Sequence, residues 1–588
     1  MIKQEIEKVI QKSFDDPKRE FGDFEVADIL LEHPENMEHG DYSTNVALVL
    51  ARKLSKNPRE VAEEIRSRIL DTKYQILNTS IEKVEVAGPG FINFFLSKEY
   101  FLDVLFSILK EKEKYGAGSG KKKIIVEYSS PNIAKPFGIG HLRSTLIGQA
   151  IYNLYKFLGY KTIGISYPGD WGTPHGKILY QLEDKLLKGK SDKEKKEILD
   201  KLTIQDLESL YVEFHQNTTP EMAEGARFLF KRLGQGDKEA RGLWAKTRAV
   251  SFKEFERIYA LLDVNIDHVI GESFFENKME EVITDFKKKG LAQESQGALI
   301  VSFPNDAFPP AMLLKSDRAT TYFTRDLANM KYRISKWQPD SIVIETGVEQ
   351  ILHFQQVFLA SRMIGYAKDE ELVHVFHGLY RTKEGKFSTR KGQTIHLEEV
   401  LGEAVDKARE IIEQSETARG LSEQEKAEVA KAVGIGGIKY NDLSQHPSGG
   451  IVFDWGKILN LKGNSAPYVQ YTYARCKSIL RKAEIEELRN LVSKLETKFL
   501  SKEEIVLLRL LYRFPEVVRE AAIRFSPNLV AAFAFETAQA YNVFYNTHSV
   551  LQAETKEAKN FRLLLTAAVS QVINNGLSLL GIKTLERM

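Results

Sequence analysis

The strongest constraint on the fold is a strand–helix–strand pattern in residues 122–166. Three β-branched residues, 124–126, form a short apolar run that is typical of a buried strand. After a turn cluster, apolar residues spaced four apart over 142–158 mark one face of a helix, and isoleucines at 163 and 165 begin a second strand. The pattern is one β-α-β unit, which predicts a parallel sheet.

Polar side chains gather where the first of these strands ends. Ligands of parallel sheets bind beyond the carboxyl ends of the strands. Glycines at 138 and 140 let a bulky anion approach the backbone, and the start of the helix offers free N–H donors. Spacing alone also fits an ordinary strand–loop–helix with turn glycines. The polar side chains on this crossing are Glu127, Asn132, Lys135 and His141.

A second group of polar residues follows much later in the chain. Residues 319–326 read Ala-Thr-Thr-Tyr-Phe-Thr-Arg-Asp, and 341–344 is another apolar run typical of a buried strand. Carboxylates and carbonyls at strand ends suggest a cationic ligand. A helix cap or an ion-pair partner is the other interpretation of Asp326. The candidate acceptors are Glu127, Asn132, Asp326 and Gln350.

A basic segment bounded by glycines, 385–392, reads Gly-Lys-Phe-Ser-Thr-Arg-Lys-Gly. Cations on a mobile loop of this kind can close over a triphosphate and stabilise the charge that develops during adenylyl transfer. Taken alone, the segment is also explained as an exposed basic turn. Its functional interpretation therefore depends on the polar group at the first strand.

Two other regions have patterns that predict secondary structure but contain no motif that indicates chemistry. Residues 184–288 are rich in charge with helical periodicity, and we expect them to be helices inserted within the nucleotide fold. Helices are also expected over 397–419 and 422–433. The glycine-rich segment 434–443 is expected to be a backbone bend between packed segments.

Composition restricts the class of protein. The 588 residues suggest several domains, and 43% hydrophobic with 28% charged residues is ordinary for a globular protein. A net charge of +2 means that any RNA surface is a local patch. The single cysteine, Cys476, excludes an intrachain disulfide and a zinc site built from several cysteines. With no apolar run of membrane-spanning length and an acidic N-terminus, we expect a cytoplasmic protein without a membrane partner.

The motifs resemble those of the arginyl-tRNA synthetases, a family of class I synthetases. Residues 130–137, followed by Gly-His-Leu-Arg-Ser-Thr, resemble the family's first signature, and 385–392 resembles the second. The class motif His-Ile-Gly-His reads Gly-Ile-Gly-His at 138–141, so the first histidine is absent. Thr389 stands where the class has a second lysine, and the resemblance implies that Lys135 takes over its role.

The resemblance covers essentially the whole chain and implies three domains in an α/β fold. A small α+β domain that binds the tRNA D-loop is expected at 1–107. A Rossmann-type catalytic domain with a parallel sheet and helical insertions is expected at 120–455. An all-α anticodon-binding domain is expected at 456–588.

The resemblance also implies the activity, arginine–tRNA ligation. ATP activates L-arginine to arginyl-adenylate, and the arginyl group passes to the 3′ end of tRNA(Arg). ATP with Mg²⁺ is the expected cofactor, and the chain is expected to act as a monomer. A guanidinium is planar and always charged, which agrees with the acceptors at the strand ends.

Each site residue is carried over by its position in the motifs. The catalytic residues are Lys135, His141, Lys386 and Arg390. The ATP-binding residues are Pro136, Gly138, Gly140, His141, Lys386, Ser388 and Lys391. The arginine-binding residues are Glu127, Asn132, Tyr322, Asp326 and Gln350. The tRNA-binding residues are Phe91, Asn93, Tyr468, Tyr471, Tyr541 and Met588, and no protein site for a metal is expected.

Two alternatives remain open at this stage. An RNA-binding protein that has lost amino-acid activation would explain Gly138 in place of the first signature histidine. Another nucleotidyltransferase of the same fold would explain the nucleotide motifs, but it would leave the N-terminal region and the C-terminal helices without a role. Consumption of ATP only when arginine and tRNA are both present would separate these alternatives from a ligase.

Overall fold

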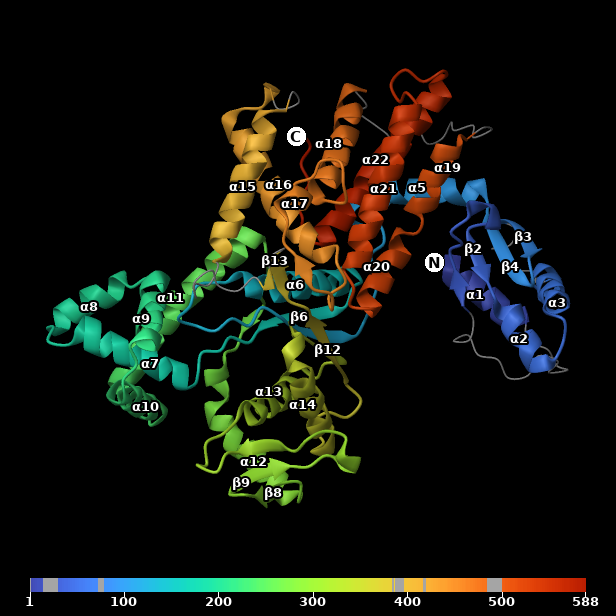
Figure 1. Ribbon diagram of the computed structural model, residues 1–588. Helices are drawn as coiled ribbons and strands as arrows, with labels where there is room; N and C mark the ends of the chain where they lie inside the picture. Colours follow the sequence, from blue (N-terminus) through green and yellow to red (C-terminus); the bar gives the residue numbers. More distant parts are fainter. Residues whose placement is uncertain are drawn as a thin grey trace. The chain divides into compact units, whose positions relative to one another are not determined.

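The computed structural model describes residues 2–13, 30–71, 79–382, 385–386, 396–415, 419–483 and 500–588. The chain forms two compact units (Figure 1). The first unit comprises Met1–Gly116, Thr472–Val517 and Glu536–Asn575. The second unit comprises Ala117–Tyr471, Val518–Phe535 and Gly576–Met588. No helix in the described part of the chain is long and apolar enough to cross a membrane.

The second unit is built on a five-stranded parallel sheet with the strand order β12-β11-β5-β6-β7. Helix α6 (Leu142–Phe157) connects its two central strands, so the predicted β-α-β unit and parallel sheet are confirmed. The strands are β5 (Lys123–Glu127), β6 (Lys161–Ser166), β7 (His268–Val269), β11 (Ser341–Gly347) and β12 (Glu371–His377).

Helices cover this sheet because its strands are apolar on both faces. Ile125, Ile165 and Ile342 are fully buried in a core that also contains side chains of α12 (Met279–Lys288), α13 (Tyr322–Trp337) and α14 (Ile351–Met363). Burial on both faces is the usual state of strands in parallel sheets. This arrangement leaves the carboxyl edge of the sheet for ligands.

A helical insertion separates β6 from β7 and gathers in one lobe (Figure 1). Leucines of its helices share a second core, with Leu179, Leu207 and Leu229 all buried. The lobe consists of α7 (Thr173–Gln181), a π-helix at Leu182–Leu187, α8 (Asp192–Lys201), α9 (Ile204–Gln216), α10 (Pro220–Gly234) and α11 (Lys238–Leu262).

The second unit also contains two small sheets and a pair of helices. The first sheet is antiparallel and contains β8 (Gln293–Ser295), β9 (Ala298–Val301) and β10 (Ala311–Leu314). The second contains β13 (Tyr380–Thr382), β14 (Gly385–Lys386) and β15 (Ile451–Val452). Helices α15 (Leu397–Glu413) and α16 (Glu423–Leu443) lie side by side, and α17 (Trp455–Ile458) follows (Figure 1).

The prediction of a bend at 434–443 is wrong, because α16 continues through these residues as one helix. Gly434 lies where α16 meets α15, and a Cβ there would come within 2.6 Å of the Ala404 carbonyl oxygen. The glycine therefore allows the two helices to pack closely and does not end the helix.

The first unit joins an α+β region to helices from the far end of the sequence. Its antiparallel sheet has the order β1-β2-β4-β3. The strands are β1 (Leu31–Glu32), β2 (Tyr42–Thr44), β3 (Ile81–Ala87) and β4 (Phe91–Leu96). The helices of this region are α1 (Ile2–Ser13), α2 (Val46–Leu54), α3 (Pro58–Asp71) and α5 (Lys98–Glu111).

Polar contacts hold this sheet to the C-terminal helices within the first unit. Asp41 forms an ion pair with Arg509 at 2.8 Å, and Tyr42 donates a hydrogen bond to Glu516. Helix α5 packs against α19. The helices from the later part of the chain, several of which continue into the second unit, are α18 (Ala466–Lys482), α19 (Lys502–Leu511), α20 (Phe514–Ile523), α21 (Asn528–Thr547) and α22 (Lys556–Leu579).

Candidate active site

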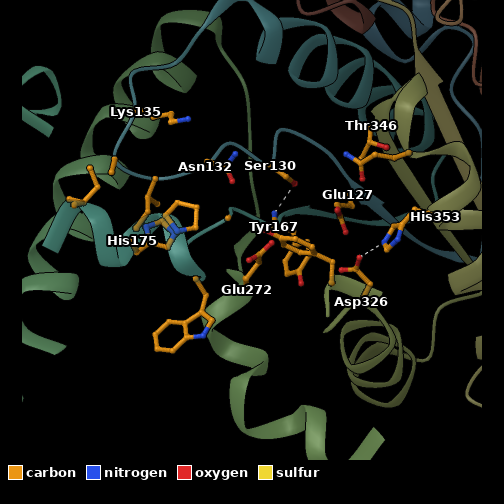
Figure 2. A pocket seen from close by; sticks show the side chains of 18 of the residues that line it. Glu127, Ser130, Asn132, Lys135, Tyr167, His175, Glu272, Asp326, Thr346 and His353 are labelled. Carbon is orange, nitrogen blue, oxygen red and sulfur yellow. Dashed lines mark hydrogen bonds and ion pairs between the residues drawn. The ribbon is translucent and has the colours of Figure 1, made fainter. Parts of the chain in front are cut away.

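A cavity of about 480 Å³ opens at the carboxyl ends of β5, β6 and β11 in the second unit (Figure 2). Its size lies within the range of about 300–1,000 Å³ that is usual for small-molecule sites. Strand ends and helix starts supply the lining, because the parallel strands all finish at this edge of the sheet. The sequence-predicted site therefore coincides with a cavity.

Three carboxylates line this cavity, and each contacts a basic side chain. Glu127 ends β5 and forms a buried ion pair with Arg333. Glu272 follows β7, and its Oε2 lies 3.0 Å from Nη1 of Arg325. Asp326, one turn into α13, lies 2.6 Å from Nε2 of His353. Figure 2 shows Glu127, Glu272 and Asp326 grouped around Tyr167.

Burial raises the pKa of two of these carboxylates. Desolvation raises the pKa of Glu127, although the Arg333 guanidinium opposes the shift. Desolvation raises the pKa of Glu272 to about 8 against the opposing effect of Arg325. Glu272 is therefore mostly protonated at neutral pH without a ligand. A cation bound beside it would favour its ionised form.

The structure brings together all five residues predicted to bind arginine. Besides the carboxylates Glu127 and Asp326, the cavity is lined by Asn132, Tyr322 and Gln350. The Asn132 and Tyr322 side chains are exposed. Their placement suits ligand binding, but the individual roles stay predictions.

The sequence interpretation missed several lining residues. Glu272 and Tyr211 belong to the region 184–288, for which no chemistry was expected. Both residues line the cavity, so in this respect the expectation is wrong. A carboxylate just after an edge strand was a usable signal for Glu272, but β7 has only two residues. The other missed lining residues that are labelled in Figure 2 are Ser130, Tyr167, His175, Thr346 and His353.

Lys135 reaches the cavity from the loop after β5. Ala134 before it has a left-handed backbone with φ of 64°, and its N–H donates to Ser251 Oγ at 2.9 Å. The Lys135 ammonium lies 4.2 Å from the centre of the Tyr211 ring. The predicted catalytic lysine therefore lines the same cavity as the predicted arginine-binding residues.

The Gly-Ile-Gly-His part of the first signature, residues 138–141, lies at the start of α6, outside the lining of the cavity. The Gly138 N–H donates to Nδ1 of His141 at 3.2 Å, so the proton of the neutral ring is on Nε2. Burial and the nearby Lys135 lower the pKa of His141 to about 4. His141 is thus neutral at physiological pH. Pro136, Gly138 and Gly140 share this segment.

Residues that follow the second signature lie beside the first. His396 pairs with Gly138 in an antiparallel bridge, and the Leu397 N–H donates to the Phe137 carbonyl at 2.8 Å. Lys386 ends β14, and only its backbone is described. The predicted Ser388, Arg390 and Lys391 lie outside the described residues, so their roles stay predictions.

The predicted D-loop contacts differ in exposure within the first unit. Phe91 begins β4 and is exposed. Asn93 is 3% exposed, and its Oδ1 accepts a hydrogen bond from Ser43 at 2.7 Å. In this conformation Phe91 is accessible to RNA and Asn93 is not.

The predicted anticodon contacts also differ. Tyr541 is fully buried and donates a hydrogen bond to Thr566 at 3.2 Å, so its contact with a base would require this part of the unit to open. The other three are half-buried, and their roles stay predictions. They are Tyr468, Tyr471 and Met588.

Models of three protein families match the chain. The model "tRNA synthetases class I (R), catalytic domain" matches residues 104–455. "Arginyl tRNA synthetase N terminal domain" matches 1–96, and "DALR anticodon binding domain" matches 469–588. The chain belongs to the arginyl-tRNA synthetase family. The family predicted from the two signatures is confirmed, as is the α/β class with a helical C-terminal region.

Curated arginyl-tRNA synthetases match over nearly their full length. "Arginine--tRNA ligase" of Clostridium botulinum (strain 657 / Type Ba4) is 40% identical over 565 residues, covering 95% of this chain and 96% of the relative. That of Clostridium perfringens (strain 13 / Type A) is 39% identical over 578 residues, covering 97% and 98%.

Solved arginyl-tRNA synthetase structures share the fold. The structure from Plasmodium falciparum has a TM-score of 0.83 at 24% identity and covers 100% of this chain and 99% of its own. The structure from Thermus thermophilus has a TM-score of 0.82 at 23% identity and covers 100% of both chains. At such identities these likenesses concern the fold alone.

Proposed function

We propose that the chain is an arginine–tRNA ligase. An oxygen of the arginine carboxylate attacks the α-phosphorus of ATP, which forms arginyl-adenylate and releases pyrophosphate. A 3′-terminal ribose hydroxyl of tRNA(Arg) then attacks the arginyl carbonyl and releases AMP. The single observation that carries the substrate assignment is the group of three carboxylates in one cavity at the sheet edge.

This group suits a ligand with two cationic ends. A guanidinium offers a planar fork of donors that carboxylates accept in pairs, and the α-ammonium needs a further acceptor. Glu127, Glu272 and Asp326 supply the charge, while Asn132, Tyr322 and Gln350 supply neutral polar groups. Because Tyr322 and Asp326 lie one turn apart on α13, the helix fixes the distance between them.

Neither step needs a protein nucleophile, so catalysis depends on positioning and on charge stabilisation. The Lys135 ammonium lines the cavity and would stabilise charge on the phosphates. Neutral His141 would donate a hydrogen bond from Nε2. The remaining groups assigned to ATP are Pro136, Gly138, Gly140, Lys386, Ser388, Arg390 and Lys391.

Mg²⁺ is assigned to the nucleotide substrate and not to a protein site. Each carboxylate of the cavity already contacts a basic side chain among the described residues. Mg²⁺ commonly keeps its waters and binds through substrate phosphates, where it neutralises their charge. The chain's own part is therefore to hold the ATP that carries the ion.

The tRNA surface is proposed to involve Phe91 with Asn93 at the D-loop and aromatic residues of the C-terminal helices at the anticodon. Stacking of an unpaired base on an aromatic ring contributes about 1–3 kcal/mol. The boundaries 1–107, 120–455 and 456–588 are proposed as the functional domains. The protein is proposed to act as a monomer in the cytoplasm.

The test is aminoacylation of total tRNA with each of the twenty amino acids in the presence of ATP and Mg²⁺. Charging with arginine alone is expected. Tight tRNA binding without charging would support the inactive RNA-binding alternative and overturn the proposal.

A variant pair connects this activity to the cavity. Asp326→Asn is expected to lower kcat/KM for arginine by about 100-fold or more, because a buried cation loses its charged partner. Asp306→Asn, an exposed carboxylate outside the cavity, is the matched control and is expected to retain activity. Equal activity of the two variants would remove Asp326 from the arginine site.

A further inference from the structure

We propose that Tyr211 of the inserted helix α9 positions Lys135 for the nucleotide step. The inference rests on the proposed function, because it concerns the lysine assigned to the ATP phosphates. Tyr211 acts through Lys135 and is a positioning residue. The inserted lobe would then organise the active site and not only surround it.

The contact between the two side chains is direct. The Lys135 ammonium lies 4.2 Å from the centre of the Tyr211 ring, which is within the range of a cation–π interaction. Both side chains line the cavity. The described residues offer the Lys135 ammonium no hydrogen bond and no ion pair, so the ring is its principal partner in the free protein.

The base of the Lys135 side chain is fixed independently. Ala134 adopts a left-handed backbone, which a residue with a Cβ rarely does, and Ser251 accepts its N–H. Such a conformation persists only where the surrounding structure holds it, and it often marks a functional site. The backbone thus aims the lysine, but four flexible side-chain bonds still separate the ammonium from it.

The Tyr211 ring is itself held in place. His215, one turn later on α9, lies with its ring centre 4.2 Å from that of Tyr211. Its Nδ1–H donates to the Tyr211 carbonyl at 2.9 Å, and Nε2 then accepts from the Lys177 ammonium at 3.1 Å. Because a neutral His215 ring satisfies both contacts, it supports Tyr211 without adding a charge that would repel Lys135.

Helix α9 also contacts the segment after the second signature. Glu208, three residues before Tyr211, lies 3.0 Å from Nε2 of His396. His396 pairs with Gly138 of the first signature. Residues three apart on a helix share a face, so one face of α9 contacts Lys135 of the first signature and His396, which follows the second. The adjacent face, with Leu207 and Leu210, is buried in the core of the lobe, and Tyr211 also packs against that core.

The strength of the contact suits a positioning role. A cation–π contact is weaker than a charge-assisted hydrogen bond between an ammonium and a phosphate. The ring can therefore order the ammonium in the free protein and give it up when the triphosphate arrives. Removal of the ring leaves the charge in place but lets the side chain spread over many rotamers.

A double-mutant cycle tests this inference. Tyr211→Leu is expected to lower kcat/KM for ATP by about 5- to 20-fold when Lys135 is present. In a Lys135→Met background the same substitution is expected to change it by less than about twofold, because its effect depends on Lys135. KM for arginine is expected to stay within about twofold, which a collapsed cavity would not allow. Tyr211→Phe keeps the ring and is expected to retain activity.

Equal losses from Tyr211→Leu in both backgrounds, or no loss in either, would overturn the inference. A loss in Tyr211→Phe as large as that in Tyr211→Leu would overturn the role of the ring face. Val212→Ala, an exposed neighbour on α9, is the control for helix integrity, and thermal melting checks that each variant is folded.

ATP affinity, measured by calorimetry on the same four proteins, reports the coupling without any charging reaction. Wild-type protein that charges no arginine would therefore overturn the proposed function while this cycle still decides the role of Tyr211. A smaller loss of ATP affinity on Tyr211→Leu in the Lys135→Met background is expected, and equal losses contradict the inference.

Discussion

At the scale of single residues, the cavity is a set of charges that partly neutralise one another. Glu127 and Glu272 each pair with an arginine of the chain itself, and Asp326 contacts His353. An incoming cationic ligand must compete with these partners. The affinity for the ligand therefore depends on how readily each carboxylate binds a second basic group. Glu272 is distinctive, because its raised pKa makes its charge depend on the ligand.

Arginine binding is expected to release a proton near neutral pH. Without ligand, Glu272 has a pKa of about 8, and a bound guanidinium or ammonium lowers it. Between the lowered pKa of Glu272 in the arginine complex and about 8, binding therefore expels the Glu272 proton, and affinity rises with pH up to about 8 and then levels off. The rise is at most about tenfold per pH unit.

Calorimetry at pH 7 in buffers with different heats of ionisation measures this release directly. The apparent binding heat of the wild type is expected to vary with the buffer. Glu272→Gln cannot ionise and is expected to lose this dependence, although it binds arginine more weakly. Heats that are independent of the buffer in the wild type would contradict the role assigned to Glu272.

At the scale of elements, the sequence predicted what short-range patterns determine. The strand–helix–strand of residues 122–166 appears as β5, α6 and β6, because apolar runs and helical spacing are local properties. Glycines were less informative, and Gly434 was read as part of a bend although it lies within α16. A glycine in a sequence can mark either a helix break or a close approach of two helices. At Gly434 it marks a close approach, because α15 packs against it.

The candidate site follows the same rule. Glu127 and Asn132 were predictable because they follow a strand that is evident in the sequence, and Asp326 stands in a motif. Tyr211 was not predictable, because only the folding of the inserted lobe brings α9 to the cavity. The second signature contributed motif information, but most of its side chains lie outside the described residues.

The α15–α16 pair offers two glycines with opposite expected effects. Gly434→Ala would place a Cβ within 2.6 Å of the Ala404 carbonyl oxygen, so the helices must separate and the substitution is expected to cost about 1–3 kcal/mol. Gly402→Ala on α15 meets no atom within 4 Å and is expected to stabilise the helix by about 0.5–1 kcal/mol. Thermal melting of both variants checks the signs, and a Gly434→Ala variant as stable as Gly402→Ala would refute the close packing.

At the scale of the whole molecule, the first unit is assembled from three separate stretches of the sequence. Several polar contacts hold its N-terminal sheet to the later helices, and Asp41 takes part in two of them. The Asp41 carboxylate accepts a hydrogen bond from the Leu96 N–H at 2.8 Å and pairs with Arg509. Burial raises the pKa of Asp41, and the nearby Arg509 guanidinium opposes this shift.

Arg509→Met is expected to loosen the N-terminal sheet. The substitution leaves a buried carboxylate without its cation, at a cost of about 2 kcal/mol, below the value for a fully buried pair because Arg509 is partly exposed. Hydrogen exchange of β2 and β4 amides is then expected to become about 10- to 50-fold faster.

Lys83→Met is the matched control for this change, because it breaks an exposed ion pair with Glu85 in the same sheet. It is expected to change the exchange by less than about fivefold. Similar exchange in the two variants would show that Asp41 and Arg509 do not hold the sheet.

The division of the first unit among distant stretches has a consequence for biosynthesis. At about 5–20 residues per second, a ribosome needs roughly 20–70 s to add residues 117–471, which separate the first stretch of this unit from the second. During that time α5 has no α19 to pack against, and Asp41 has no Arg509. The apolar surface of the nascent N-terminal region therefore stays exposed during this time. This is the stage of synthesis at which chaperones are most needed to prevent aggregation.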